Sequence, residues 1–364
     1  MVISMGEKMD FEGILKRAEK EEITREEALY LFQKAQSWDR ALRLFETASK
    51  VRDEEAGRVC KLMGFICCIT HCTVDPICKY CFRWASEKSF APETVLNSEE
   101  LASAVSAIEE RGIKRVELGG GTLQGEEGRA TTFNAVEVAR KASNLELWIN
   151  NGPSFREEDV FKFKELGVKG IACNFETINE HIFRELRPGD SFEHRKKIVE
   201  ATEKAGLGID NTLMIGLGER WGQNHPYSDW VDFLFYFKRF NNFKILEVHP
   251  FRPIKGSPTQ DYPPGSSFEA AKAKAIGRLI FRDIDIAGAD DTIGLMAGAN
   301  LIMHCLPVVR KTRMSLLPGV HPGINIKMEE ISDTLVLVDN LPIVTRSAIE
   351  LGMEIEPDIA EKFS

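Results

Sequence analysis

The sequence predicts an α/β protein built around a (β/α)8 barrel of the TIM type. Short apolar segments with strand character alternate eight times with amphipathic helical segments, and this alternation predicts a parallel sheet that closes on itself. A doubly wound open sheet of similar size is the alternative fold. We expect three parts: an N-terminal helical extension at 1–58, the barrel at 59–310, and a C-terminal extension at 311–364 packed on the barrel.

The N-terminal residues 8–58 carry apolar side chains at helical spacing and show no residues that indicate chemistry. Thr24 stands three residues before Glu27, which is the spacing of a capping box and marks the start of one helix. This part is therefore expected to be a helical preface to the barrel.

The barrel strands are expected at eight places in the following 250 residues, with amphipathic segments between them. Glycines that commonly end helices stand at Gly112, Gly167 and Gly206. Beyond the last strand, residues 328–344 are expected to form a small hairpin or a strand–helix pair. The strands lie near 63–70, 115–119, 145–150, 170–175, 208–215, 245–250, 283–287 and 300–304.

Composition and charge exclude several classes of protein. The 364 residues are 43% hydrophobic and 28% charged, as in an ordinary globular protein, and the net charge of -9 argues against a general nucleic-acid binder. No apolar run approaches the ~20 residues of a membrane helix, and the N-terminus lacks the apolar core of a signal peptide. We therefore expect a cytoplasmic protein. Six of the eight cysteines fall between Cys60 and Cys81, which favours a local metal site in a reducing compartment over a disulfide framework.

Three of these cysteines, Cys72, Cys78 and Cys81, are spaced C-x5-C-x2-C directly after the first strand. Barrels place their chemistry at this end of the strands. Three cysteines suit a 4Fe-4S cluster that keeps one iron open, whereas a Cys3His zinc site with His71 is the alternative. The remaining cysteines are expected to be small buried apolar residues: Cys60, Cys67, Cys68, Cys173 and Cys305.

With an aromatic residue, Tyr80, just before the last cysteine, this loop resembles that of the radical S-adenosylmethionine (SAM) superfamily, whose usual spacing is C-x3-C-x2-C. The resemblance extends over residues 15–310 and implies a 4Fe-4S cluster and SAM as cofactors. The end of the second strand, Gly119, Gly120 and Gly121, resembles the segment that holds the methionine amino group of SAM. A tight turn between strand and helix is the alternative for these glycines.

The fourth strand and the helix after it resemble biotin synthase and its relatives at Asn174, Glu176 and Arg195, which implies that these residues bind SAM. A carboxylate can accept hydrogen bonds from ribose hydroxyls or an ammonium group, and a guanidinium can clamp a carboxylate. A surface helix with ordinary ion pairs is the alternative. Arg187 could reach substrate or brace the loop.

Residues 212–219, 248–258 and 297–307 resemble the group that contains biotin synthase, methylornithine synthase and the FeFe-hydrogenase maturase. In this group the ends of the fifth and sixth strands flank the adenine, which implies Met214 and His249 as further SAM-site residues. Met214 fits the core of the barrel equally well.

The C-x5-C-x2-C spacing resembles the radical SAM protein with which methanogens build the guanylylpyridinol iron cofactor of Hmd-type hydrogenase. This implies reductive cleavage of SAM to a 5′-deoxyadenosyl radical, a step in pyridinol ring formation, a small-molecule substrate such as a pyridinol precursor, and an electron donor such as a ferredoxin or flavodoxin. Neither nucleic acid nor membrane is expected as a partner. The alternatives are a zinc-stabilised barrel hydrolase or lyase and a non-catalytic iron–sulfur scaffold.

Overall fold

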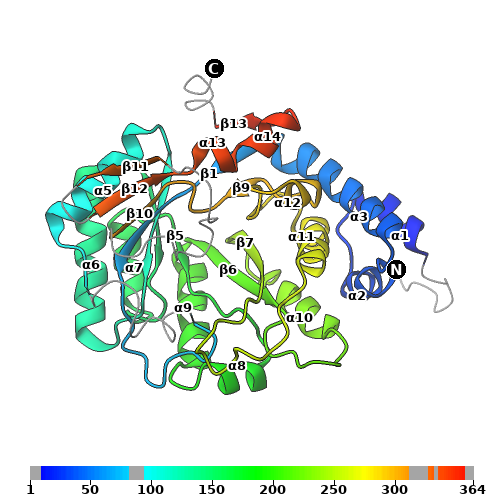
Figure 1. The fold of residues 1–364 in the computed structure, drawn as a ribbon, viewed down its shortest axis with the longest axis horizontal. Helices are drawn as coiled ribbons and strands as arrows, with labels where there is room; N and C mark the ends of the chain where they lie inside the picture. The colour runs from blue at the N-terminus through cyan, green and yellow to red at the C-terminus, as the bar shows by residue number, and fades with distance from the viewer. Residues whose placement is uncertain (1–9, 82–93, 311–326, 332–334, 357–364) are drawn as a thin grey trace.

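A computed structural model of the chain describes residues 10–81, 94–310, 327–331 and 335–356. Strands occupy the centre of the molecule and helices surround them, with the N-terminal helices beside α11 on one flank (Figure 1). None of the helices in the described ranges is long and apolar enough to cross a membrane.

The N-terminal helices begin at side-chain caps. The Thr24 hydroxyl accepts a hydrogen bond from the backbone N–H of Glu27, and the Glu27 carboxylate accepts one from the backbone N–H of Thr24, so the predicted capping box is confirmed. The longest of these helices packs against α11 (Ser267–Phe281) of the barrel. The N-terminal elements are α1 (Phe11–Ala18), α2 (Arg25–Lys34), α3 (Trp38–Val51) and a short π-helical turn, η1 (Arg52–Ala56).

The barrel strands run parallel to one another in chain order. The first strand has two parts, β1 and β2, on either side of Met63, and β2 pairs with β3, as does each following strand with the next as far as β8. The strands are β1 (Val59–Leu62), β2 (Gly64–Ile69), β3 (Arg115–Gly120), β4 (Glu146–Asn150), β5 (Gly170–Ala172), β6 (Gly208–Ile215), β7 (Phe243–Pro250), β8 (Asp285–Ile286) and β9 (Leu301–Ile302).

The sheet closes between its last and first strands. Ala287, just after β8, forms a parallel bridge with Leu301 of β9, and β9 in turn pairs with β1 in parallel through Lys61↔Leu301. Because β1 runs on into β2, the eight strands form a ring. The predicted (β/α)8 barrel is confirmed, and the doubly wound alternative is wrong.

Helices connect the strands on the outside of the ring. The helix before β6 ends at Gly206, whose left-handed backbone (φ 69°) fits the predicted helix-ending glycine. Besides α11, the outer helices are α5 (Ser98–Glu110), α6 (Gly125–Ala142), α7 (Asp159–Glu165), α8 (Glu180–Leu186), α9 (Phe192–Ala205), α10 (Tyr227–Phe237) and α12 (Thr292–Met296).

The C-terminal elements extend the barrel sheet at its first strand. β10 (Pro307–Arg310) pairs in parallel with β2, and β12 (Leu335–Asp339) lies antiparallel between β10 and β11 (Lys327–Glu330). α13 (Leu341–Val344) follows β12, so residues 328–344 contain both the antiparallel strand pair and a short helix. The chain continues through α14 (Arg346–Glu350) to β13 (Glu354–Ile355), which pairs with β1.

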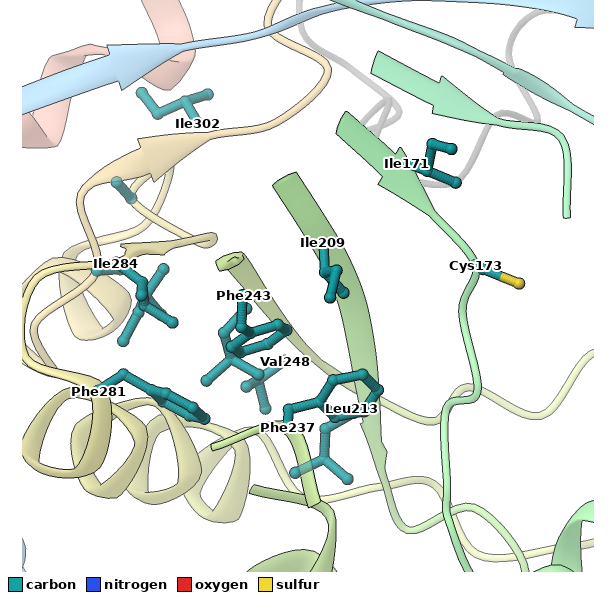
Figure 2. Packing of buried hydrophobic residues seen from close by; sticks show 14 of the residues in the cluster. Ile171, Cys173, Ile209, Leu213, Phe237, Phe243, Val248, Phe281, Ile284 and Ile302 are labelled. Atoms are coloured by element: carbon teal, nitrogen blue, oxygen red, sulfur yellow. The ribbon is translucent and has the colours of Figure 1, made fainter. Parts of the chain in front are cut away.

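Successive side chains of each strand point alternately outward, into an apolar layer beneath the helices, and inward, into the barrel interior. In Figure 2, Ile209 and Leu213 of β6 and Val248 of β7 lie with Phe237 of α10 and Phe281 of α11 in this outer layer. The interior has its own apolar floor, in which Met63, Trp148, Ile245 and Leu301 contact one another. Toward the carboxyl ends of the strands the interior also contains polar residues, such as Glu117 and His304, beside the Phe65 ring.

Candidate active site

The loop with Cys72, Cys78 and Cys81 leaves the carboxyl end of β2 and is bound to the rest of the barrel through its backbone. The N–H of Thr73 donates to the carbonyl of Thr122 at 2.9 Å, and the N–H of Lys79 donates to the carbonyl of Leu186 at 2.8 Å. The loop is thus attached to the β3–α6 connection and to the end of α8.

The end of β3 consists of glycines because neighbouring backbone and side-chain atoms lie too close to it to leave room for a Cβ. A Cβ on Gly121 would lie 1.5 Å from the carbonyl oxygen of His71, and one on Gly120 would lie 2.3 Å from that of Ile69. A Cβ on Gly119 would lie 2.5 Å from the Phe65 ring. The glycine run therefore lets the cysteine loop pack directly on the second barrel strand, which is a more specific reason than a tight turn.

All three loop cysteines are free thiols of intermediate burial. Burial raises the pKa of Cys78 to about 11, the nearby Arg187 guanidinium lowers it, and the Cys81 thiol raises it further. Within the described ranges, no three His, Cys, Asp or Glu side chains gather around one point as ligands of a single metal ion. The three-thiol donor set fits a 4Fe-4S cluster, in which each thiolate binds its own iron.

Tyr80 belongs to a small apolar cluster that joins the cysteine loop to the ends of other strands. It packs with Leu186, Leu217 and Phe251, and Cys78 and Met214 lie against the same cluster. The structure therefore brings Tyr80 and Met214 together beside a loop cysteine, although they are far apart in sequence.

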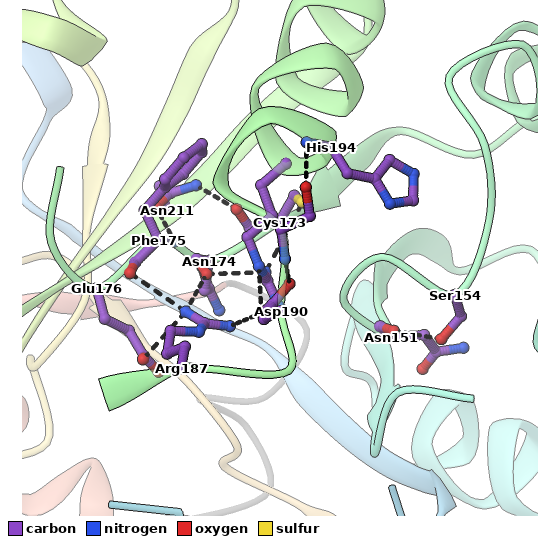
Figure 3. A network of polar contacts seen from close by, with 12 residues as sticks. Asn151, Ser154, Cys173, Asn174, Phe175, Glu176, Arg187, Asp190, His194 and Asn211 are labelled. Atoms are coloured by element: carbon purple, nitrogen blue, oxygen red, sulfur yellow. Dashed lines mark hydrogen bonds and ion pairs between the residues drawn. The ribbon is translucent and has the colours of Figure 1, made fainter. Parts of the chain in front are cut away.

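A buried polar network lies behind the end of β5, and its centre is Asp190 (Figure 3). The Asp190 carboxylate is 2.8 Å from a guanidinium nitrogen of Arg187 and 2.8 Å from one of Arg195. Both arginines also donate to the carbonyl oxygen of Asn174 at 2.8 Å. The two guanidinium groups hold the pKa of Asp190 well below its usual range.

Glu176 stands at the end of the fourth strand with a left-handed backbone, φ 65°, which is uncommon for a residue other than glycine. Its carbonyl accepts a hydrogen bond from the N–H of Met214 at 2.9 Å, and its Oε2 lies 3.3 Å from Arg187. Burial raises the pKa of the Glu176 carboxyl, and Arg187 opposes this effect. The Glu176 side chain keeps 19% of its surface accessible at the strand end.

Arg195 lies deeper than the sequence suggested, because its side chain is only 4% exposed. Its guanidinium is bonded to Asp190 and to the Asn174 carbonyl, and it approaches the sulfur of Cys173 at 3.8 Å. The alternative of an ordinary surface ion pair therefore does not describe this residue. The side-chain oxygen of Asn174 accepts a hydrogen bond from the N–H of Thr212 at 3.1 Å.

The interior holds three carboxyl groups that sequence reasoning missed: Glu117 of β3, Asp210 of β6 and Glu247 of β7. Glu117 and Glu247 are flanked on both sides by residues of the outer apolar layer, and Asp210 is flanked by one on its N-terminal side, so each faces inward. His249 is 3.0 Å from Glu247, and His304 is 3.5 Å from Glu117. The available signal was one acidic residue beside apolar residues in each of these strands.

A sequence profile described as the radical SAM superfamily matches residues 66–225. An uncharacterized protein of Methanocaldococcus jannaschii is 34% identical over 334 residues, which cover 91% of this chain and 84% of that protein. The chain belongs to the radical SAM superfamily. It is a radical SAM enzyme, and its cofactors are a 4Fe-4S cluster and SAM. Family membership replaces both the zinc-barrel and the non-catalytic scaffold interpretations.

More distant radical SAM relatives match most of the chain. The biotin synthase of Thermodesulfovibrio yellowstonii is 22% identical over 70% of this chain and 81% of its own length. The 3-methylornithine synthase of Methanosarcina acetivorans is 25% identical over 73% of this chain and 75% of its own.

Two solved structures share the fold. The crystal structure of methylornithine synthase superposes with a TM-score of 0.76 at 20% identity, covering 96% of this chain and 99% of that chain. The FeFe-hydrogenase maturase of Carboxydothermus hydrogenoformans superposes with a TM-score of 0.74 at 19% identity, covering 95% of this chain and 79% of that chain.

Proposed function

We propose that this radical SAM enzyme holds its cluster through Cys72, Cys78 and Cys81 and cleaves SAM reductively. The observation that carries the proposal is the position of three free thiols on one loop at the carboxyl end of the first barrel strand. When bound, the cluster and SAM supply a 5′-deoxyadenosyl radical, because one electron breaks the sulfonium C–S bond and leaves methionine. The apolar side chains of Tyr80 and Phe251 exclude water beside the loop.

The residues proposed to contact SAM lie at or just after the carboxyl ends of the second, fourth, fifth and sixth barrel strands. Glu176 is the strongest of them, because its side chain is partly accessible and its left-handed backbone is of the strained kind that is retained at functional sites. Arg195 has one guanidinium N–H beyond those bonded to Asp190, Asn174 and Cys173, so it reaches SAM through that donor or by exchanging a contact. The full set is Gly119, Gly120, Gly121, Asn174, Glu176, Arg195, Met214 and His249, with Tyr80 beside the cluster loop.

Cluster binding and SAM cleavage are tested together on anaerobically reconstituted protein. We expect about four irons per chain and formation of 5′-deoxyadenosine and methionine from SAM with dithionite as reductant. Cys81→Ala should lose both, whereas Cys305→Ala, a buried thiol away from the loop, should keep both. Equal 5′-deoxyadenosine from wild type and Cys81→Ala, measured by mass spectrometry, would refute the proposal.

SAM binding is tested by equilibrium dialysis without reductant. Glu176→Gln should bind SAM more weakly, since loss of one charge-assisted contact costs about 1.5–3 kcal/mol, or roughly tenfold to a hundredfold in affinity. Arg195→Ala should weaken binding more than Arg195→Lys, because lysine keeps the charge without the planar fork. Wild-type affinity in Glu176→Gln and Arg195→Ala together would show that SAM lies elsewhere.

We further propose that the radical acts on a small molecule in forming the pyridinol ring of the guanylylpyridinol cofactor of Hmd-type hydrogenase. The C-x5-C-x2-C spacing supports this role, and so do the relatives in Methanocaldococcus and Methanosarcina and the structural likeness to a hydrogenase maturase. A ferredoxin or flavodoxin is the proposed electron donor.

The test of this role uses small-molecule extract from cofactor-producing methanogen cells in which the corresponding gene is deleted, so that the precursor accumulates. Adding the reduced, reconstituted protein and SAM should yield a new pyridinol and faster formation of 5′-deoxyadenosine. Faster SAM cleavage with a different product would keep the radical SAM activity and reject the pyridinol role.

A further inference from the structure

The barrel interior contains three carboxyl groups from three strands, and the proposed SAM contacts use none of them. Glu117, Asp210 and Glu247 are 0%, 1% and 6% exposed, respectively. They lie between the apolar floor and the carboxyl ends of the strands. The Glu117 and Glu247 carboxylates raise the pKa of Asp210, and Glu247 also raises the pKa of Glu176. The three carboxyls are therefore close enough to the proposed SAM site to interact with it electrostatically. Buried acidic residues are rare unless they have partners.

The partners of these carboxyls are few. Asn150 donates to Glu117 at 2.5 Å, His304 lies 3.5 Å from Glu117, and His249 lies 3.0 Å from Glu247. The Glu247 side chain also forms hydrogen bonds with the side chains of Thr212 and Asp210. Among the described residues, neither lysine nor arginine forms an ion pair with any of the three carboxyls. The interior therefore has more acceptors than donors.

Asp210 is the extreme case. Its Oδ1 is buried and has no hydrogen-bond partner among the described residues, and Oε2 of Glu117 likewise lacks a close one. Burial and the neighbouring Glu247 and Glu117 carboxyls raise the pKa of Asp210 well above its usual value. A buried carboxyl surrounded by other carboxyls costs stability, and natural proteins retain such groups where they bind something.

The partner that we consider for these carboxyls is an organic cation. Within the part of the chain that the structure describes, no three acidic, histidine or cysteine side chains gather around one point as metal ligands do. Access exists from the carboxyl ends of the strands, because His249 and His304, which adjoin the carboxyls, keep 48% and 45% of their side-chain surface exposed.

We infer that Glu117, Asp210 and Glu247 bind a primary ammonium group of the substrate inside the barrel. An ammonium group carries three N–H donors, and β3, β6 and β7 each contribute one buried carboxyl group to the interior. Its positive charge relieves the repulsion among the carboxyls. This inference rests on the proposed function only for calling the bound molecule a substrate, since the binding site itself consists of residues of this chain.

The test measures binding of three probes of similar shape: propylammonium, 1-propanol and propionate. Reconstituted protein with SAM and without reductant is titrated with each probe, and binding is followed by saturation-transfer NMR. Wild type should bind propylammonium at least about tenfold more tightly than either other probe, as expected for charge-assisted hydrogen bonds. Equal binding of 1-propanol would overturn the inference, and so would displacement of propylammonium by stoichiometric Mg²⁺.

Variants locate the site. Asp210→Asn and Glu247→Gln should each weaken propylammonium binding at least about tenfold, whereas Glu46→Gln, on the exposed face of α3, should not. Asp210→Asn should fold, because the amide has the volume of the carboxyl and cannot be charged; thermal unfolding followed by circular dichroism checks this. Unchanged propylammonium binding in both interior variants would reject the site.

The outcome is separate from that of the proposed function, because SAM cleavage is measured afterwards in the same preparations. Wild type that cleaves SAM but does not prefer propylammonium would reject the ammonium site alone. Wild type that binds propylammonium through Asp210 but does not cleave SAM would reject the proposed reaction and leave the ammonium site standing.

Discussion

Asp190 shows at the scale of one residue how the candidate site is held together. Its carboxylate is 2% exposed and binds the guanidinium groups of both Arg187 and Arg195. The two arginines hold the carbonyl of Asn174, and Arg187 also approaches Glu176. One buried carboxylate therefore fixes the strand end that carries the proposed SAM contacts.

Asp190→Asn should lower the free energy of unfolding by about 3–5 kcal/mol at pH 7, since it leaves two buried guanidinium groups without their shared carboxylate. Urea unfolding followed by circular dichroism measures this. The folded-state pKa of Asp190 is lowered, so its contribution is complete above the unfolded value of about 3.9 and is lost as the pH falls toward the lowered one. The difference between wild type and Asp190→Asn should therefore shrink in acid.

The control for this prediction is Glu193→Gln. Glu193 is in the first turn of α9, which begins just after Asp190; it faces solvent and lies 3.5 Å from Lys196. Its change should cost less than about 0.5 kcal/mol. Equal unfolding free energies for the two variants at pH 7 would contradict the role given to Asp190.

At the scale of elements, the fit between the cysteine loop and the end of β3 decides where the thiols lie. The backbone at the end of β2 lies so close to Gly120, and that of the loop so close to Gly121, that a side chain at either glycine would collide with it. Gly189, beyond α8, also lies close to the loop, because a Cβ there would be 2.5 Å from the Asp75 backbone. Three segments thus determine the path of the loop.

Gly121→Ala should displace the cysteine loop, because the added Cβ would lie 1.5 Å from the carbonyl oxygen of His71. We expect the reconstituted variant to hold less than half of the wild-type iron while its far-ultraviolet circular dichroism stays that of the wild type. Iron and sulfide analysis makes the measurement.

Gly125→Ala, four residues further along the same connection, is the matched control. Its Cβ would meet nothing within 4 Å, and its φ of +80° adds only backbone strain. It should keep its iron. Full iron retention in Gly121→Ala would show that the loop tolerates displacement.

At the scale of the whole molecule, closure of the barrel depends on Arg278 of α11. This side chain is fully buried and donates to the carbonyls of Gly298 and Ile284 at 3.0 and 2.7 Å and to Oδ1 of Asn300 at 2.9 Å. These acceptors flank β8 and β9, the strands that complete the ring. Burial lowers the pKa of Arg278 to about 9.

Arg278→Leu should lower the free energy of unfolding of the whole protein by at least about 3 kcal/mol, because it leaves several buried acceptors without donors. Urea unfolding should show one cooperative transition at lower denaturant. Arg346→Leu, which changes an exposed arginine paired with Glu350, should leave the transition within about 0.5 kcal/mol of wild type. Wild-type stability in Arg278→Leu would mean that closure does not need this residue.

The sequence by itself determined the barrel and the position of the cysteine loop. Alternating apolar segments are local signals, and all eight expected strands match strands or strand ends of the structure. The three cysteines lie within ten consecutive residues after β2, so covalent spacing alone brings them to one loop. Their role as ligands, the SAM contacts and the domain boundaries at 58 and 310 remain predictions.

Only the tertiary structure decided which distant residues meet. The sequence could not indicate that Asp190 joins Arg187 to Arg195, that the glycines of β3 serve the path of the cysteine loop, or that Arg195 is buried. Nor could it show that Glu117, Asp210 and Glu247, which lie on three separate strands, share one interior. Each of these contacts depends on how the strands twist and close into a ring, and that geometry is set by packing across the whole barrel and not by any local pattern of residues.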